Sequence, residues 1–239
     1  MKINYNYIKI SLLAIFTVII CSFATSRNKK RLVSKPQIEF LGTNNLFITS
    51  DAVSNLLIQN HPAYKNLTKE ALDLNGLEQS LLKNPMISNA EVYVNAQGVL
   101  KAEVLQKQPI ARVMGQQQFY IDSNGGYMPL SANYTERVPF VTGQVSKQKL
   151  NVVYQMAHAV LNDSFLKKQV IEIHQDKDEL ISLKLRETNF EVIVGSLENL
   201  EKKVNNLKAF FIKATKDKTL NEYKTVNLQF DNQVVCSKV

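Results

Sequence analysis

The sequence predicts an α+β protein with a single N-terminal transmembrane helix, a small βααββ domain and a sheet-dominated β domain that carries two or more helices. An apolar run lies near the N-terminus, and after it the hydrophobic spacing switches between the periods of strands and helices. The composition, 45% hydrophobic and 21% charged, is that of a folded chain. We therefore expect one membrane segment followed by two small domains.

The first element is the apolar segment from Tyr5 to Thr25, which reads YNYIKISLLAIFTVIICSFAT. A helix of about 20 residues spans the hydrocarbon core of a bilayer, and this segment has no polar face. The side chains expected to contact lipid are Leu12, Leu13, Ile15, Phe16, Val18, Ile19 and Ile20. The segment predicts a membrane anchor, with residues 1–4 as a short cytoplasmic start and residues 26–36 as a basic linker.

Two other fates of this segment stay open. Ser22 and Ala24 have the spacing of small residues at a signal-peptide cleavage site. Cys21 could carry a lipid, although the bulky Ile20 before it argues against this. The apolar run is longer than that of a usual signal peptide, which favours an uncleaved anchor.

Basic residues gather around this segment rather than in the body of the protein. Of the 29 Lys and Arg residues, six lie in residues 1–31 beside no acid, which leaves 23 basic against 21 acidic side chains in residues 32–239. Nucleic-acid binding needs cations clustered on a fold, so no nucleic-acid partner is expected. Lys2 precedes the span, Lys9 lies near its start and the other four follow it, a count that by itself places the body in the cytoplasm.

Residues 37–108 predict one α+β unit. Ile38 and Phe40 alternate with polar neighbours and indicate a strand, and residues 49–51 offer N-caps to a helix that ends near residues 60–62. Asn75 and Glu78 have the spacing of a capping box at the start of a second helix.

A hairpin completes this unit. Residues 90–94 and 100–105 alternate between apolar and polar, and residues 95–98 between them form a turn. The predicted order is therefore strand, helix, helix, strand, strand.

Residues 109–239 predict a sheet-rich second domain. Short extended segments stand before a helix at about residues 149–161, and three strands follow it. Ser196 is the expected cap of a last helix, whose apolar residues Leu200, Val204, Leu207 and Phe211 repeat at helical spacing. In the segment Tyr223–Asp231, alternate residues including Phe230 share one face, which predicts a half-buried strand.

The chain offers no catalytic or metal-binding constellation. His61, His158 and His174 lie far apart without a partner at metal-ligand spacing. Asp122 precedes a Gly-containing loop, where an Asx turn accounts for it. We expect no enzyme activity, no cofactor, no metal and no small-molecule substrate.

Short segments in order along nearly the whole chain are similar to the FtsQ/DivIB family of bacterial division proteins. They are Ile38–Gly42, Asn84–Val92, Gln108–Arg112, Tyr120–Asp122 with Gly125, Pro139–Gly143 and Tyr223–Phe230. The resemblance implies a POTRA-like domain in residues 37–108 and a C-terminal β domain in residues 109–239. It also implies a body in the periplasm, against the charge count, and a location in the inner membrane at the division septum.

The resemblance further implies a non-enzymatic divisome assembly protein. Its partners would be FtsB-like and FtsL-like single-pass division proteins and, through them, the septal peptidoglycan synthase complex. The cytoplasmic start is shorter than in the best-known members, which favours the C-terminal strands as the contact surface. The alternative is a secreted or lipid-anchored envelope protein whose POTRA module acts in outer-membrane protein assembly, but the residues after Gln144 hold too few strands for the β-barrel found there.

The family pattern also indicates where the partner binds. A tyrosine in a Leu-x-Tyr-Asp stretch of relatives takes part in holding the FtsB-like protein, and Phe230 stands at the matching position. The expected partner-binding residues are Tyr223, Leu228, Phe230, Asn232, Val234 and Val235. The alternation alone supports a second interpretation, in which Phe230 fills the domain core.

Overall fold

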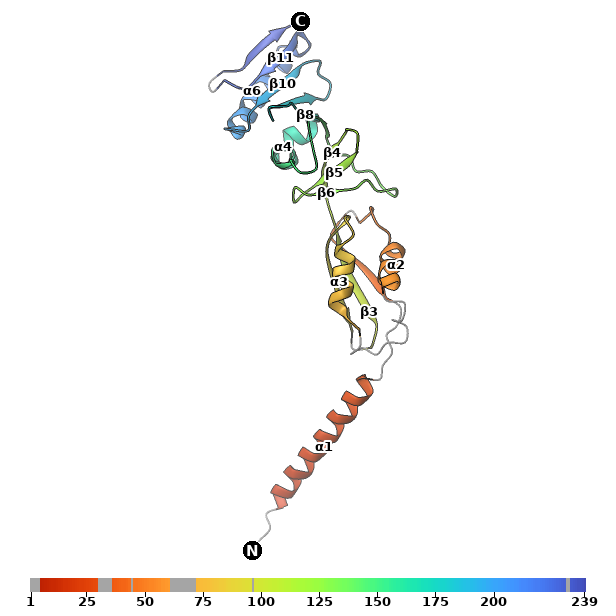
Figure 1. Ribbon diagram of the computed structural model, residues 1–239. Coiled ribbons are helices and arrows are strands. Elements are labelled where there is room, and N and C mark those ends of the chain that lie inside the picture. Colours follow the sequence, from red (N-terminus) through yellow and green to blue (C-terminus); the bar gives the residue numbers. More distant parts are fainter. Residues whose placement is uncertain (1–4, 30–35, 44, 61–71, 96, 231–232) are drawn as a thin grey trace. The chain divides into compact units, whose positions relative to one another are not determined.

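The computed structural model describes residues 5–29, 36–43, 45–60, 72–95, 97–230 and 233–239. It divides into two compact units, Met1–Gln106 and Lys107–Val239 (Figure 1). Asn232 and the predicted helix end at residues 61–62 lie outside the described residues.

The N-terminal helix α1 runs from Tyr5 to Lys29. Its segment Lys9–Ser26 has a mean hydropathy of 1.9 and is long and apolar enough to cross a membrane, a test that a signal sequence also passes. The predicted anchor side chains all lie on its exposed surface. The hydroxyls of Thr17 and Thr25 donate to backbone carbonyls within the helix, which satisfies their hydrogen-bonding capacity without water.

The first unit has the predicted order of elements. These are β1 (Gln37–Leu41), α2 (Ser50–Asn60), α3 (Leu74–Leu82), β2 (Ile87–Val94) and β3 (Leu100–Gln106). The sheet order is β1-β3-β2, with β1 parallel and β2 antiparallel to β3. Both helices pack on one face of the sheet, where Leu77, Leu81, Val92 and Val104 are buried, and the other face is open.

The start of α3 differs from the prediction. Its cap is Asp73, whose carboxylate accepts the N–H of Gly76 at 2.9 Å, so the capping box of Asn75 and Glu78 was wrong. Glu78 instead accepts the backbone N–H of Val92 at 2.8 Å and joins the helix to the sheet. Glu78 therefore has the spacing of a capping box but makes a tertiary contact instead of capping the helix.

The end of the first unit is held by a buried side chain. Gln106 is 1% exposed, and its amide accepts from the N–H groups of Phe47 and Ile48 and donates to the carbonyl of Ile48. These three bonds fix the loop between β1 and α2 against the end of β3.

The second unit is a nine-stranded mixed sheet with three helices on one face. Its elements are β4 (Pro109–Val113), β5 (Phe119–Asp122), β6 (Tyr127–Met128), β7 (Phe140–Gly143), α4 (Asn151–Asn162), α5 (Ser164–Gln169), β8 (Val170–Gln175), β9 (Ile181–Leu185), β10 (Glu191–Gly195), α6 (Leu200–Lys216), a 3-10 turn (Leu220–Glu222), β11 (Tyr223–Asn227) and β12 (Val235–Lys238). The strand order is β12-β11-β10-β9-β8-β7-β4-β5-β6.

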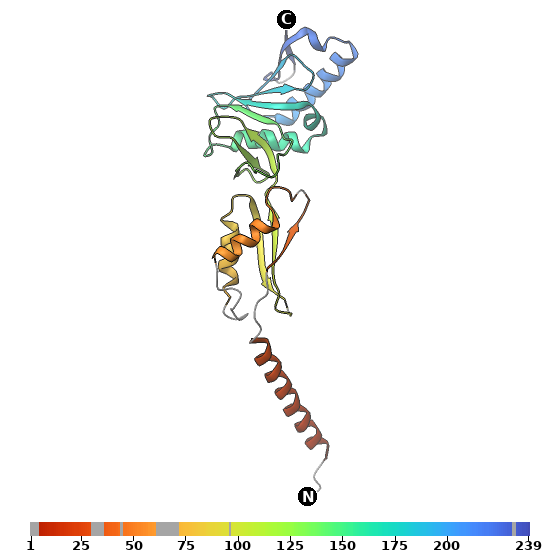
Figure 2. The same ribbon diagram turned by 90° about the vertical axis from the view of Figure 1, so that its right-hand side faces the viewer.

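The register of this sheet separates a core face from an open face. Val141, Ile173, Leu183, Val192 and Val226 pair across five neighbouring strands and are each at most 1% exposed. Side chains of α4, α5 and α6 complete this core. Figure 2 shows these helices beside the sheet. The opposite face carries polar and charged side chains.

Two details of the helices were missed. The short helix α5 had no clear signal because six residues give less than two turns of periodicity. Ser196 does not cap α6, which begins at Leu200 after Asn199 in a left-handed conformation with φ 54°. The Ser196 carbonyl instead accepts from the buried ammonium of Lys203, which also donates to Val194.

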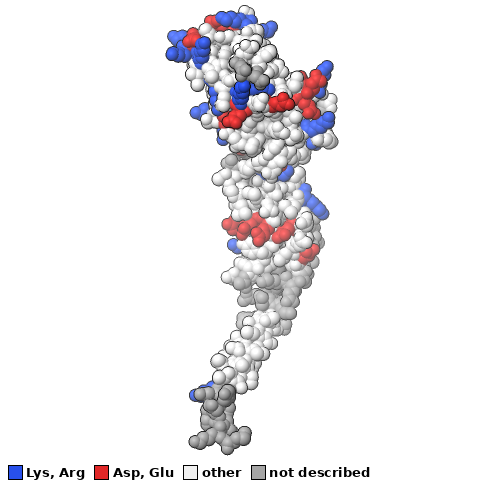
Figure 3. All heavy atoms as spheres, turned by 90° about the vertical axis from the view of Figure 1, so that its left-hand side faces the viewer, with Lys and Arg blue, Asp and Glu red and all other residues white. Residues whose placement is uncertain are grey.

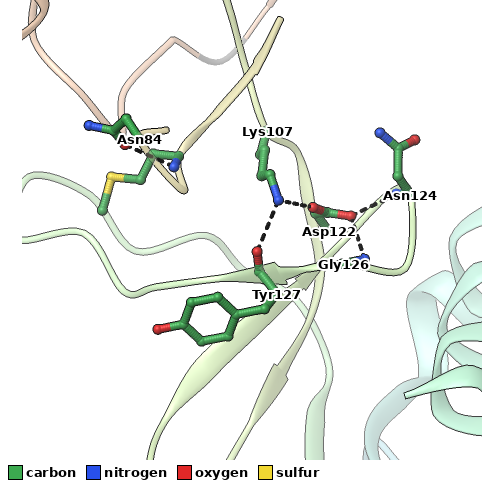
Figure 4. A network of polar contacts seen from close by, with 7 residues as sticks. Asn84, Lys107, Asp122, Asn124, Gly126 and Tyr127 are labelled. Carbon is green, nitrogen blue, oxygen red and sulfur yellow. Dashed lines mark hydrogen bonds and ion pairs between the residues drawn. The ribbon is translucent and has the colours of Figure 1, made fainter. Parts of the chain in front are cut away.

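The first strands of this unit are tied together around Asp122 (Figure 4). Its carboxylate is 2% exposed and accepts the N–H groups of Asn124 and Gly126, which confirms the predicted Asx turn. The Lys107 ammonium lies 2.7 Å from the carboxylate and also donates to the Tyr127 carbonyl. The ion pair gives the buried carboxylate a compensating charge and joins the segment before β4 to β5 and β6.

Candidate partner-binding site

The last two strands form one edge of the nine-stranded sheet. β12 pairs antiparallel with β11, which itself pairs parallel with β10. On its other side β12 has no strand partner within the described ranges. An edge of this kind presents unpaired backbone groups to which an extended segment can add.

The hydrogen bonds of β11 determine which groups of β12 face outward. The N–H of Leu228 donates to the Ile193 carbonyl at 2.9 Å, so the backbone groups of Leu228 point to β10. Because backbone groups alternate in direction along a strand, the N–H and C=O of Asn227 point to β12. Those of Val235, the residue opposite, point back to β11. The N–H and C=O of Cys236, the next residue, therefore point to the open edge.

Apolar side chains lie on β12 and in the segment between β11 and β12. Phe230 is 46% exposed and Val235 is 41% exposed, whereas Val234 is half-buried against the core. Tyr223 is half-buried and packs edge-on against Phe210 with ring centroids 5.2 Å apart. Leu228 is only 2% exposed and packs in the core of the domain.

The structure overturns the interpretation that Phe230 fills the core. β11 ends at Asn227, whose side-chain oxygen accepts the N–H of Gln229 at 2.9 Å and turns the chain. The alternation predicted through residue 231 therefore stops, and Phe230 leaves the strand with almost half of its surface exposed.

Polar contacts stabilise the outer strand. Lys238 forms an ion pair with Glu222 at 2.8 Å, and this hydrogen bond raises the pKa of Lys238. The hydroxyls of Thr225 and Ser237 lie 2.6 Å apart across the strand pair. Burial raises the pKa of the Cys236 thiol, which keeps it protonated and unreactive near neutral pH.

No group of three or more His, Cys, Asp or Glu side chains that could hold a metal ion occurs in the part of the chain that the structure describes. The sequence pattern indicated the strand that begins at Tyr223, but it left open whether Phe230 is exposed or buried. It could not find the outward direction of Cys236, because that direction depends on pairing with β10 and β11.

An N-terminal apolar helix, a POTRA-like unit and a sheet-rich domain fit a single-pass membrane protein. The model of the family FtsQ/DivIB, C-terminal related, matches residues 108–237, and the model of the POTRA-like domain matches residues 41–105. The chain therefore belongs to the FtsQ/DivIB family.

A curated relative supports this assignment. The chain is 25% identical over 180 residues to a cell division protein FtsQ of Geotalea daltonii, a match that covers 70% of this chain and 64% of the relative. The chain thus spans less than two thirds of the length of this relative. The homology supports a cell-division protein.

Proposed function

We propose that this chain is a non-enzymatic assembly protein of the divisome. α1 anchors it in the cytoplasmic membrane, the body lies in the periplasm, and it works at the septum. It holds FtsB-like and FtsL-like single-pass proteins and, through them, helps to control the septal peptidoglycan synthase. Family membership and the open β12 edge support this proposal.

The single observation that carries the binding mechanism is an unpaired edge strand beside exposed apolar side chains. An extended partner segment adds antiparallel or parallel to β12 and exchanges hydrogen bonds with the backbone of Cys236. Phe230 and Val235 offer exposed apolar area to that segment. The lack of a hydroxyl on Phe230 makes this contact depend on area rather than on a hydrogen bond.

The first test is the variant Phe230→Ala. We expect it to weaken binding of the C-terminal segment of the same organism's FtsB-like protein by about 1 to 2 kcal/mol, the level of an interface hot spot. Fluorescence anisotropy with the purified full-length chain measures this. Because Phe230 is 46% exposed, the thermal unfolding of the variant should match that of the unchanged protein.

Val234→Glu introduces a charge at a half-buried position beside the edge and should weaken binding to at least the same extent. Since Val234 packs against the core, its unfolding transition must be measured alongside. Loss of binding together with loss of folding would assign Val234 to the core. Full binding by folded Phe230→Ala and Val234→Glu variants would put the site elsewhere.

A backbone test separates strand addition from side-chain contact. Cys236→Pro removes the N–H that points to the edge, whereas Cys236→Ser keeps it. We expect the proline variant to lose binding and the serine variant to keep it. Equal binding by both would exclude backbone pairing at this residue.

Topology and cellular role need separate tests. Protease added to spheroplasts should digest the body, and the mass of the mature protein should include α1. Complete protection from the protease would place the body in the cytoplasm. Depletion should produce filaments or unseparated cells, and normal septation would contradict the proposed role.

A further inference from the structure

A groove lies on the helical side of the β domain, between α6 and the corner where α4 meets α5. It encloses about 330 Å³. Its lining is apolar at Ala159, Leu166, Leu200 and Val204 and polar at Glu201 and Asn205, and the ion pair between Lys208 and Asp163 also lies on it. Burial raises the pKa of Asp163, but hydrogen bonds from Lys208 and from backbone N–H groups outweigh it and leave the pKa below its usual value.

The apolar stripe continues beyond the groove along α6. Phe211 follows Val204 and Lys208 at helical spacing and packs edge-on against Phe165 at 5.2 Å, with both rings half-buried. The next residue, Ile212, is 69% exposed. From Leu200 to Ile212 the stripe extends about 18 Å at the rise of an α-helix. Packing within the domain therefore leaves most of the Ile212 side chain uncovered.

Lysines lie at the C-terminal ends of the two helices that carry this stripe. Lys167 and Lys168 occupy the last turn of α5, and Lys213 and Lys216 occupy the last turn of α6. All four are exposed, and none joins an acidic side chain in an ion pair of the described residues. A cation near a helix C-terminus interacts favourably with the helix dipole. This explains part of the placement of the lysines but not the apolar side chains near them.

We propose that this α5–α6 surface, formed by Phe165, Leu200, Phe211 and Ile212 with the four nearby lysines, docks an acidic amphipathic helix of a partner protein. Apolar side chains of the partner at positions i, i+3, i+4 and i+7 enter the groove and cover Ile212. Acidic side chains beside them face the lysines. A stripe of about 18 Å matches roughly twelve helical residues, or three turns.

The charge and shape of the surface select this occupant over two others. A second copy of the same surface would bring lysines against lysines. A lipid bilayer needs a wide apolar face, whereas here one isoleucine protrudes and the rest of the apolar area lines a groove.

The test uses the full-length chain in detergent micelles and a labelled 14-residue peptide of Leu and Glu, with Leu at amphipathic helical spacing. Two peptides serve as controls, one with the same composition in scrambled order and one with Lys in place of Glu. We expect the acidic amphipathic peptide to bind at least tenfold more tightly than either control. Added salt should weaken this binding, because the lysine contacts are screened.

Variants locate the binding. Ile212→Glu and, separately, Lys216→Glu should each weaken binding of the acidic peptide at least threefold. Neither should change the unfolding transition, since both side chains are exposed. The matched control Leu46→Glu changes a residue of the other domain that is 51% exposed and should leave binding unchanged. Phe230→Ala should also bind normally, which separates this surface from the β12 edge.

Three results would overturn the proposal. These are equal binding of the scrambled peptide, unchanged binding by folded Ile212→Glu and Lys216→Glu variants, and binding to phosphatidylglycerol vesicles that depends on Ile212 in the absence of peptide binding. The last result would identify a lipid surface instead.

Discussion

The open faces of the two sheets arrange their charges in opposite ways. In the POTRA-like sheet, Glu39, Glu103 and Glu91 stand directly opposite one another across β1, β3 and β2. In the β domain, Glu172, Lys184 and Glu191 likewise stand opposite one another in a row across β8, β9 and β10. The first row places like charges side by side, and the second alternates their signs.

The contacts of the two rows reflect this difference. Lys184 lies 2.9 Å from Glu172, which also accepts from the Thr142 hydroxyl at 2.7 Å. Glu103 has no lysine beside it in the row and accepts from the Tyr93 hydroxyl at 2.7 Å. Figure 3 shows acidic side chains gathered across one level of the POTRA-like domain. Opposite charges across strands stabilise a sheet and like charges destabilise it, so only the second row adds to the stability of its domain.

The largest expected effect comes from separating β8 from β7, whose Thr142 hydroxyl donates to Glu172 of the alternating row. Gly143 has φ 93°, and a Cβ there would meet the carbonyl oxygen of Gln175 at 1.9 Å. Gly143→Ala should therefore separate β7 from β8 and cost at least about 2 kcal/mol of unfolding free energy. Urea denaturation measures this. Gly115→Ala, where the nearest atom lies at 4.0 Å, is the control that should cost far less.

The second change turns the alternating row into a row of like charges. Lys184→Glu removes the ion pair with Glu172 and places three acids side by side, and it should cost about 1 to 2 kcal/mol. Hydrogen exchange of the β8–β10 amides reports the loss locally, and the loss should shrink at high salt. Lys224→Glu, an exposed control on β11, should change little. An equal loss in both variants would show that the row has no special role.

The reverse change should stabilise the POTRA-like domain. Glu103→Lys places a cation between Glu39 and Glu91 and should add about 0.5 to 1 kcal/mol, although it removes the bond from Tyr93. Glu103→Gln removes the repulsion without adding attraction and should give a smaller gain. Amide exchange of β2 and β3 measures both variants. A loss of protection in both would mean that the Tyr93 contact outweighs the repulsion.

The smallest effects are those of pH. Burial raises the pKa of Glu172, but hydrogen bonds from Lys184 and Thr142 outweigh it and lower the pKa below the usual value of 4.5. The folded state therefore binds this proton less tightly than the unfolded state, and the contribution of Glu172 is present above pH 4.5 and is lost as the pH falls through the folded pKa. Acid titration of the unfolding free energy should show a shallower loss in Glu172→Gln.

Tyr93 gives the opposite sign at the alkaline end. The hydrogen bond to Glu103, together with burial and the neighbouring glutamates, raises the pKa of Tyr93 above 10.0. Its contribution is present below pH 10.0 and is lost as the pH rises through the folded pKa. Tyr93→Phe should remove this alkaline decline in the amide protection of β2 and β3. A decline that persists in Tyr93→Phe would assign it to another group.

Local patterns in the sequence determined the N-terminal apolar helix, the order of elements in the first unit and most strands of the second. These features depend on residues close together in the chain, because hydrophobic period and turn residues act locally. The family resemblance, rather than these local patterns, indicated Phe230 and Val235 as candidate contact residues. The local patterns erred at Asn75 and Ser196, where a correct local signal competed with contacts from β2 and from Lys203.

Only the tertiary structure decided how the strands pair and which groups remain unpaired. The position of β12 at the sheet edge follows from the parallel pairing of β10 with β11, which joins segments more than 30 residues apart. The same holds for the outward backbone of Cys236, the two charge rows and the α5–α6 surface. Each requires residues from distant segments to meet in a definite register, and a single sequence carries no direct signal of that register because many pairings bury the same apolar residues.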